Sequence, residues 1–141
     1  MITLNPYINF NTNAEEALNF YKDIFGGELT IMRFSDMPAN PDYPVAAEHQ
    51  NLVMHGDLQA DNLRLMAADS APTGGAPTQS NISVSLSGDD EETLTRYYNV
   101  LLEGGKATVP LAKAPWGDTF GMLTDKFGVA WFVNIGAAQA S

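Results

Sequence analysis

The sequence predicts an α+β fold built from two modules, each with the element order β-α-β-β-β. The first observation is an internal repeat, because residues 8–25 and 84–101 follow one pattern of apolar, acidic and aromatic positions. The second is a Gly-Gly pair after each copy, at 26–27 and 104–105, where glycine favours the end of a helix. The third is an alternation of apolar and polar residues at the start of each copy, which is typical of a half-buried strand. A repeat this long indicates two structural halves rather than a solenoid.

The first half is predicted as a strand, a helix and three further strands. Asn13 followed by Glu16 is a capping-box pattern for a helix start, and the apolar spacing continues to residue 25. Residues 36–48 contain three prolines and are predicted as a long loop, which in proteins is often a lid or a binding loop. The strands are expected at 4–10, 28–35, 49–59 and 63–68.

The second half repeats this order. Asp89 and Glu92 form the second capping pattern, and a proline- and glycine-rich segment precedes the half. We therefore predict one domain over 1–141, made of a module 1–70, a linker 71–78 and a module 79–141. The strands of the second module are expected at 80–87, 106–111, 118–124 and 129–135.

The first strand of each half has two chemically different faces. The apolar residues Ile8, Phe10, Val84 and Leu86 should pack beneath the helices and be deeply buried. The alternate positions are polar, such as Asn9 and Ser83. These polar residues face either solvent or a cavity. Two such halves can form a shared cleft, and we therefore expect Asn9 and Ser83 to open to that cleft.

Composition excludes several functions. The 141 residues carry a formal net charge of −10, from 17 acidic and 7 basic residues, without a cluster of Lys or Arg. We therefore expect no nucleic-acid partner and no membrane partner. The chain has no cysteine, which excludes disulfides, thiolate metal sites and a cysteine nucleophile. It shows no signal-peptide pattern at its start, so a cytoplasmic location is the expectation.

With this repeat and this order of elements, the chain resembles the vicinal-oxygen-chelate superfamily, which includes glyoxalase I, bleomycin-resistance proteins and extradiol dioxygenases. Within it, the sequence is similar to the PhnB-like branch, and the resemblance covers nearly the whole chain. The Pro-Trp-Gly and Asp-Lys-Phe-Gly-Val-Ala-Trp segments are the most specific. The matching segments are 5–10, 14–21, 25–29, His55, 65–69, 115–117 and 124–131.

The resemblance implies the rest of the architecture. It implies two modules whose strands form an incomplete barrel around a central cleft, with the helices outside, and it implies a homodimer. The polar or aromatic residues expected to line that cleft are Asn5, Tyr7, Asn9, His55, Arg64, Asn81, Ser83, Trp116, Phe120 and Phe132. Two interpretations of Trp116 stay open. In one its ring closes over a ligand, and in the other it packs as a loop anchor or a dimer contact.

Enzymes of the superfamily hold a divalent metal with His or Gln from the first strand and Glu from the last strand of each half. In this sequence the first-strand positions fall on Asn5 or Pro6 and on Asn81. The last-strand positions fall near Arg64 and Leu65, and on Trp131 or Phe132. None of these is a His, Gln or Glu, so we expect no metal and no other cofactor. A site that contains His55 and Asp57, completed by another segment, is the alternative.

Two functions stay open from the sequence. The first is a small-molecule binding protein of the glyoxalase/bleomycin-resistance type, without the usual metal, for a cationic or aromatic ligand. The second is a metal-dependent or acid–base enzyme of the glyoxalase or dioxygenase class. Its candidate catalytic residue is His55, working with a carboxylate such as Asp57 or Asp69. The sequence shows no Gly-rich strand–loop–helix signature for S-adenosylmethionine.

Overall fold

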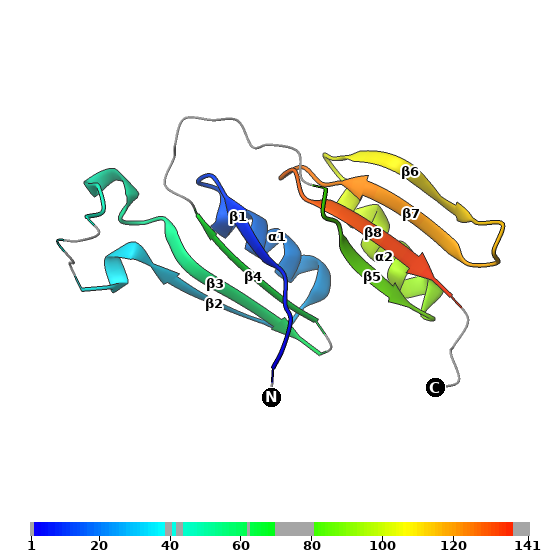
Figure 1. Ribbon diagram of the computed structural model, residues 1–141, viewed down its shortest axis with the longest axis horizontal. Coiled ribbons are helices and arrows are strands. Elements are labelled where there is room, and N and C mark those ends of the chain that lie inside the picture. Colours follow the sequence, from blue (N-terminus) through cyan, green and yellow to red (C-terminus); the bar gives the residue numbers. More distant parts are fainter. Residues whose placement is uncertain (1, 39–40, 42–43, 62, 70–80, 137–141) are drawn as a thin grey trace. The chain divides into compact units, whose positions relative to one another are not determined.

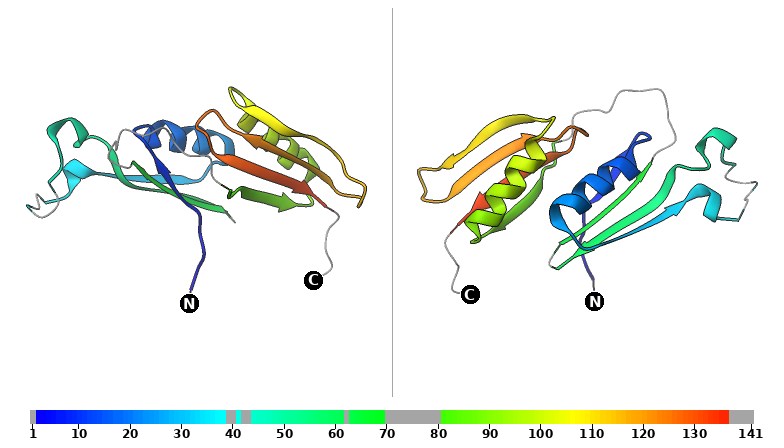
Figure 2. Two further views of the ribbon diagram at one scale, coloured as in Figure 1. Left: turned by 45° about the horizontal axis from the view of Figure 1, so that its top comes forward. Right: turned by 180° about the vertical axis from the view of Figure 1, so that it is seen from behind.

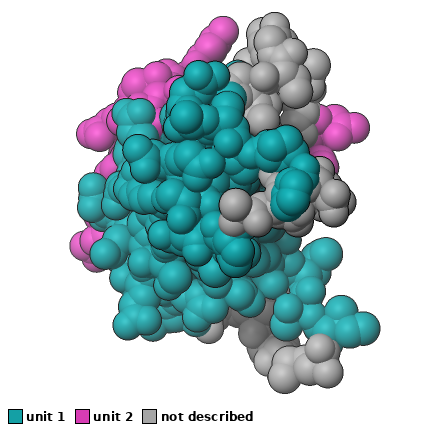
Figure 3. All heavy atoms as spheres, turned by 90° about the vertical axis from the view of Figure 1, so that its left-hand side faces the viewer, with its two compact units in different colours: residues 1–76 teal, residues 77–141 magenta. Residues whose placement is uncertain are grey.

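The computed structural model describes residues 2–38, 41, 44–61, 63–69 and 81–136. The chain divides into two compact units, residues 1–76 and 77–141, coloured separately in Figure 3. Within the described residues, each unit contains one α-helix and one four-stranded mixed sheet, which confirms the predicted α+β fold of two β-α-β-β-β modules. The predicted linker at 71–78 lies outside the described residues.

The first unit forms a sheet of order β1-β4-β3-β2 (Figure 1). Its β1 runs parallel to β4, whereas the β3–β4 and β2–β3 pairs are antiparallel. Two 3-10 turns, η1 and η2, lie near the ends of the predicted loop, at Phe34–Asp36 and Ala47–His49. The elements are β1 (Tyr7–Phe10), α1 (Ala14–Phe25), β2 (Glu28–Arg33), β3 (Val53–Ala60) and β4 (Leu63–Asp69).

The second unit repeats this topology. Its sheet has the order β5-β8-β7-β6, with β5 parallel to β8 and the remaining pairs antiparallel. The order of the strands in the two sheets is therefore equivalent, as the sequence repeat predicts. The elements are β5 (Val84–Gly88), α2 (Glu91–Leu102), β6 (Lys106–Lys113), β7 (Thr119–Thr124) and β8 (Ala130–Ile135).

Each helix lies on one face of its own sheet, as the three views of Figures 1 and 2 show. The apolar side of each helix supplies one half of a core, and alternate residues of the strands supply the other. Tyr21 and Leu18 of α1 are fully buried, and so is Leu101 of α2. On the strands, the fully buried side chains include Val53, Leu58, Leu65, Leu123, Trp131 and Val133.

The predicted burial of the first strands is only partly correct. Phe10 is buried, but Ile8, Val84 and Leu86 are half-buried rather than deeply buried. The reason is topological, because β1 and β5 lie at one end of the strand order in their sheets and are covered on fewer sides. Asn9 and Ser83 are exposed, as the alternation predicts.

Several predicted boundaries and caps are wrong. Strand β1 begins at Tyr7 rather than residue 4, directly after Pro6, which has no N–H to donate to a ladder. Strands β3 and β5 begin four residues later than predicted, at Val53 and Val84. Asn13 is the N-cap residue of α1 as predicted, but its side chain makes no capping hydrogen bond. Helix α2 is capped by Asp90 instead of Asp89. The Asp90 carboxylate accepts a hydrogen bond from the Thr93 amide at 3.0 Å.

No helix within the described residues is long and apolar enough to cross a lipid bilayer.

Candidate functional site

The face of the first sheet opposite α1 carries most of the polar candidates. Gly56 on β3 faces α1, because a Cβ built there would meet the Leu18 side chain. The alternation of a strand therefore turns His55 and Asp57 to the opposite face. Strand register places Tyr7 beside Met66 and Met66 beside Asp57, so three adjacent strands contribute to this face.

Tyr7 and His55, both predicted site residues, are in direct contact in the first unit. The Tyr7 hydroxyl lies 3.1 Å from Nδ1 of His55, and the two ring centroids are 5.6 Å apart. Tyr7 is 45% exposed, so this pair of rings is accessible rather than part of the core. The two ring planes are tilted by 33°, so the pair supplies aromatic surface and two polar atoms rather than one flat platform.

Asp57 is already engaged by Arg64. The guanidinium donates two hydrogen bonds to the carboxylate, at 3.1 Å to Oδ1 and 2.8 Å to Oδ2. The Arg64 guanidinium lowers the pKa of the Asp57 carboxyl, which therefore stays ionised at neutral pH. A carboxylate held in this way is a poor proton acceptor and is less available to a metal ion.

Asp69 has a structural role instead of the acid–base role proposed from the sequence. Its carboxylate is buried on the α1 side of the sheet, where Oδ1 accepts from the Ala14 amide at 2.9 Å. Its other oxygen accepts from the Val53 amide, also at 2.9 Å. Asp69 therefore caps α1 and fixes the start of β3, and it does not reach the His55 face.

The second unit carries a run of three aromatic rings on the face of its sheet opposite α2. Gly121 faces α2, because a Cβ built there would meet the Tyr98 ring, so Phe120 and Phe132 lie on the other face. The ring centroids of Phe120 and Phe132 are 5.7 Å apart, and those of Trp116 and Phe120 are 4.9 Å apart. We call Trp116, Phe120 and Phe132 the aromatic run.

A tight turn positions Trp116 at the exposed end of this run. The Gly117 amide donates to the Ala114 carbonyl at 3.0 Å, with Pro115 and Trp116 at the central positions. Proline at the second and glycine at the fourth position suit such a turn. Trp116 is 62% exposed, which is unusual for so large an apolar side chain.

A carboxylate borders the aromatic run. Asn134 is the register partner of Phe120, and its side-chain amide donates to Oδ2 of Asp118 at 3.1 Å. Asp118 was not among the residues predicted from the sequence. Its position directly after the Pro-Trp-Gly turn is the only signal that could have indicated it.

The positions that hold the superfamily's metal carry the wrong chemistry here. Asn5 makes a local hydrogen bond to Thr3, and Asn81 is exposed ahead of β5. Leu65 is buried beneath α1, and the buried Trp131 indole donates to Asp125 at 2.9 Å. Across the described part of the chain, no three His, Asp or Glu side chains gather closely enough to hold a metal ion.

The structure thus gathers the predicted site residues into two groups. Tyr7, His55 and Arg64, with Asn9 on the same strand as Tyr7, belong to the first sheet, and the aromatic run belongs to the second. Asn5, Asn81 and Ser83 lie in the segments that precede β1 and β5. That both groups line one cleft stays a prediction.

Comparison with known proteins decides the family. Residues 3–134 match the sequence family described as 3-demethylubiquinone-9 3-methyltransferase. The chain belongs to this PhnB-like family. The crystal structure of protein PA1353 from Pseudomonas aeruginosa shares 35% identity and a TM-score of 0.84, over 97% of this chain and 99% of that one.

Two further solved structures extend the similarity. A PhnB protein from Bacillus cereus shares 24% identity with a TM-score of 0.74, over 96% of this chain and all of that one. A glyoxalase/bleomycin resistance protein/dioxygenase superfamily member from Sphaerobacter thermophilus shares 20% identity with a TM-score of 0.55, over 96% and 99%. This more distant likeness shows the fold alone. The PhnB-like chain therefore has the glyoxalase/bleomycin-resistance fold.

Proposed function

We propose that this PhnB-like protein binds a small, planar, positively charged molecule, and that it does so without the divalent metal of its superfamily. The observation that carries the proposal is the aromatic run, which presents Trp116, Phe120 and Phe132 on the sheet face opposite α2. Neighbouring rings of the run are tilted by 36° and 32° to one another rather than stacked in parallel. The face of an aromatic ring attracts a planar ligand, and a cation over such a ring gains about 0.5–2 kcal/mol.

Charge supports a cationic ligand. The Asp118 carboxylate borders the aromatic run, and the whole chain carries a net charge of −10. A negative protein attracts cationic ligands over long range, and a carboxylate beside the rings orients the bound cation. Tyr7 and His55 provide a second ring surface in the first unit.

The residues do not fit the alternative of a metal-dependent or acid–base enzyme. Asn5, Asn81, Arg64 and Phe132 supply no carboxylate or imidazole at the superfamily's ligand positions. His55 has no available carboxylate partner of the kind proposed, because Asp57 is held by Arg64 and Asp69 caps α1. No feature of the described residues supports the methyltransferase activity that the family's description names.

The test compares a cationic and an anionic planar dye. Isothermal titration with thioflavin T should show saturable binding, whereas 8-anilinonaphthalene-1-sulfonate should bind at least tenfold more weakly. Trp116→Ala should weaken thioflavin T binding about tenfold, or about 1.4 kcal/mol, in the range of one cation–π contact. Asp118→Asn should weaken it less and should reduce its dependence on salt.

The matched control is Phe127→Ala, which removes a half-buried aromatic side chain from the β7–β8 turn of the same unit. It should leave dye binding unchanged. Equal binding of the two dyes, or equal losses in the Trp116 and Phe127 variants, would overturn the proposal.

A further inference from the structure

Two hydrogen-bonded side chains lie beside the aromatic run of the second unit. Asn134 and Phe132 are two residues apart on β8 and therefore share a sheet face, and Asn134 is also the register partner of Phe120 on β7. The Asn134 side-chain amide donates to Oδ2 of Asp118 at 3.1 Å. The amide, the carboxylate and the rings therefore lie together on the sheet face opposite α2.

The chemistry of this hydrogen bond fixes which way the Asn134 amide faces. An ionised carboxylate only accepts, so the NH₂ group is turned to Asp118 and the amide oxygen, Oδ1, is turned away from it. Within the described residues, neither this oxygen nor Oδ1 of Asp118 accepts a hydrogen bond. Neither oxygen is fully buried, because the half-buried and buried residues of the described chain include no buried side-chain oxygen that lacks a partner. Two acceptor oxygens are therefore accessible beside the rings.

Glycine at position 136 leaves room beside the carboxylate. The strand register places Gly136 opposite Asp118, one step beyond the pair Thr119 and Ile135. A Cβ built on Gly136 would lie 3.2 and 3.3 Å from the two carboxylate oxygens, closer than side chains ordinarily pack. The φ of Gly136 is outside the left-handed region, so the backbone conformation does not require glycine there. What glycine provides is the space next to Asp118.

We propose that the molecule bound at the aromatic run carries its charge on a group with at least two N–H donors, such as a primary ammonium or an amidinium. The inference rests on the proposed function and narrows its ligand class. The ring system of the ligand lies on Phe120 and Phe132. Its N–H groups donate to Oδ1 of Asp118 and to Oδ1 of Asn134, which makes Asn134 a specificity-determining residue.

Hydration makes such a preference diagnostic. A primary ammonium is more strongly hydrated than a trimethylammonium and gives up more hydration on binding, whereas an aromatic ring attracts both cations. A site made of rings alone therefore does not favour the primary ammonium. A preference for the ligand with N–H groups requires acceptor oxygens in the site, which a quaternary ammonium would leave without a donor.

The test compares two ligands with the same ring and the same charge, naphthylmethylammonium and its N,N,N-trimethyl analogue, by isothermal titration of the full chain. The wild type should bind the first at least about tenfold more tightly, which is about 1.4 kcal/mol. Asn134→Ala should reduce this preference to less than about threefold by weakening the primary ammonium alone. Unchanged binding of the trimethyl ligand then shows that the variant is folded. Trp116→Ala should weaken both ligands and keep the preference.

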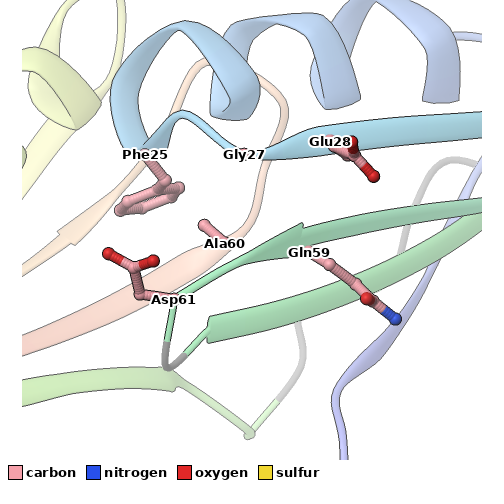
Figure 4. Close-up of a pocket in the computed structure, with 6 residues that line it drawn as sticks. All are labelled: Phe25, Gly27, Glu28, Gln59, Ala60 and Asp61. Carbon is pink, nitrogen blue, oxygen red and sulfur yellow. The ribbon is translucent and has the colours of Figure 1, made fainter.

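Two control variants separate local contacts from general effects. Asn99→Ala makes the same substitution at an exposed position of α2, and it should alter neither affinity. Asp118→Asn should weaken both ligands, because each loses its counter-charge. Asp61→Asn should not, although it removes the same charge from a carboxylate that lines a corner pocket of the first unit together with Phe25 (Figure 4).

Three results would overturn the proposal. They are equal binding of the two ligands to the wild type, an unchanged preference in Asn134→Ala, and a preference lost there because the trimethyl ligand binds better, which would indicate steric exclusion. Equal losses in Asp118→Asn and Asp61→Asn would also contradict it. Thioflavin T has no N–H group, so its binding tests the planar-cation function by itself. If thioflavin T binds while one of these results is found, only the N–H preference is wrong, and if none of the three cations binds, both proposals are wrong.

Discussion

At the scale of single residues, the buried carboxylate of Asp69 shows how a polar residue can serve architecture. Its two oxygens accept hydrogen bonds from the amides of Ala14 and Val53, which are far apart in sequence. Both donors would otherwise be buried without partners, since helix starts leave their first amides unpaired. Asp69 thus joins α1, β3 and β4 into one unit.

This role predicts a stability defect in Asp69→Asn. Asparagine keeps one acceptor oxygen and turns an NH₂ group toward the second amide, so one buried donor loses its partner. We expect the free energy of unfolding to fall by about 2–4 kcal/mol, measured by urea denaturation. Asp61→Asn, in an exposed turn, should change it by less than about 0.5 kcal/mol. An Asp69→Asn protein as stable as the wild type would contradict the capping role.

The role of Asp69 could not be predicted from its sequence position. A carboxylate at the end of a strand, 14 residues after His55, is also compatible with a catalytic His–Asp pair. Only the tertiary structure shows that Asp69 and His55 lie on opposite faces of the sheet. The predicted capping residue of α2 was wrong for a simpler reason. Asp89 and Asp90 are both good caps, and the pattern does not indicate which side chain turns toward the Thr93 amide.

At the scale of elements, the ion pair between Asp57 and Arg64 links the two strands of the β3–β4 hairpin. Arg64 lowers the pKa of Asp57, so the ionised carboxylate stabilises the folded state above the unfolded pKa of about 4. That contribution is lost as the pH falls through the lower, folded pKa.

The pair therefore predicts a pH-dependent difference between the wild type and Asp57→Asn. At pH 7 the variant should be less stable by about 0.5–1 kcal/mol, because the pair is partly exposed. The difference should shrink as the pH falls below about 4 and vanish only below the lowered pKa of the folded Asp57 carboxyl, where the wild-type side chain is also neutral. Urea denaturation over a series of pH values from 7 downward measures it, with Glu16→Gln on α1 as the control. A difference that is constant with pH would show that the loss is not electrostatic.

Strand alternation was the most reliable signal at this scale. It placed Phe10 in the core before any pairing was known, and it gave Asn9 and Ser83 the opposite face. Both are exposed, and the cleft expected in front of them stays a prediction. It could not give the degree of burial of Ile8, Val84 and Leu86, because that depends on whether a strand ends the sheet. Strand order is a property of tertiary pairing, and alternation within one strand carries no information about it.

At the scale of the whole molecule, the internal repeat predicted the two-module architecture and also shows where the modules have diverged. A Cβ on Gly27 and one on Gly105 would meet equivalent backbone atoms, yet the next residue is Glu28 in one unit and Lys106 in the other. The repeat in the sequence alone did not reveal this equivalence, because 27 and 105 lie two residues out of the register of the helix repeat and only the contacts of Gly27 and Gly105 fix it. Chemistry specific to this chain is thus found where the repeat breaks.

Both modules lack the metal-ligating residues of the superfamily, since each carries other residue types at those positions. Chelator-treated protein titrated with Mn²⁺, Fe²⁺, Co²⁺, Ni²⁺ and Zn²⁺ should therefore show no saturable rise in melting temperature. A metal bound only to the native state would add about 2.7 kcal/mol at a hundredfold excess over its Kd, which is several degrees. The control is His55→Ala, which removes an imidazole from the sheet face opposite α1. A rise that is selective for one metal and lost in His55→Ala would overturn metal-free binding and establish His55 as a ligand, with Arg64 displaced from Asp57.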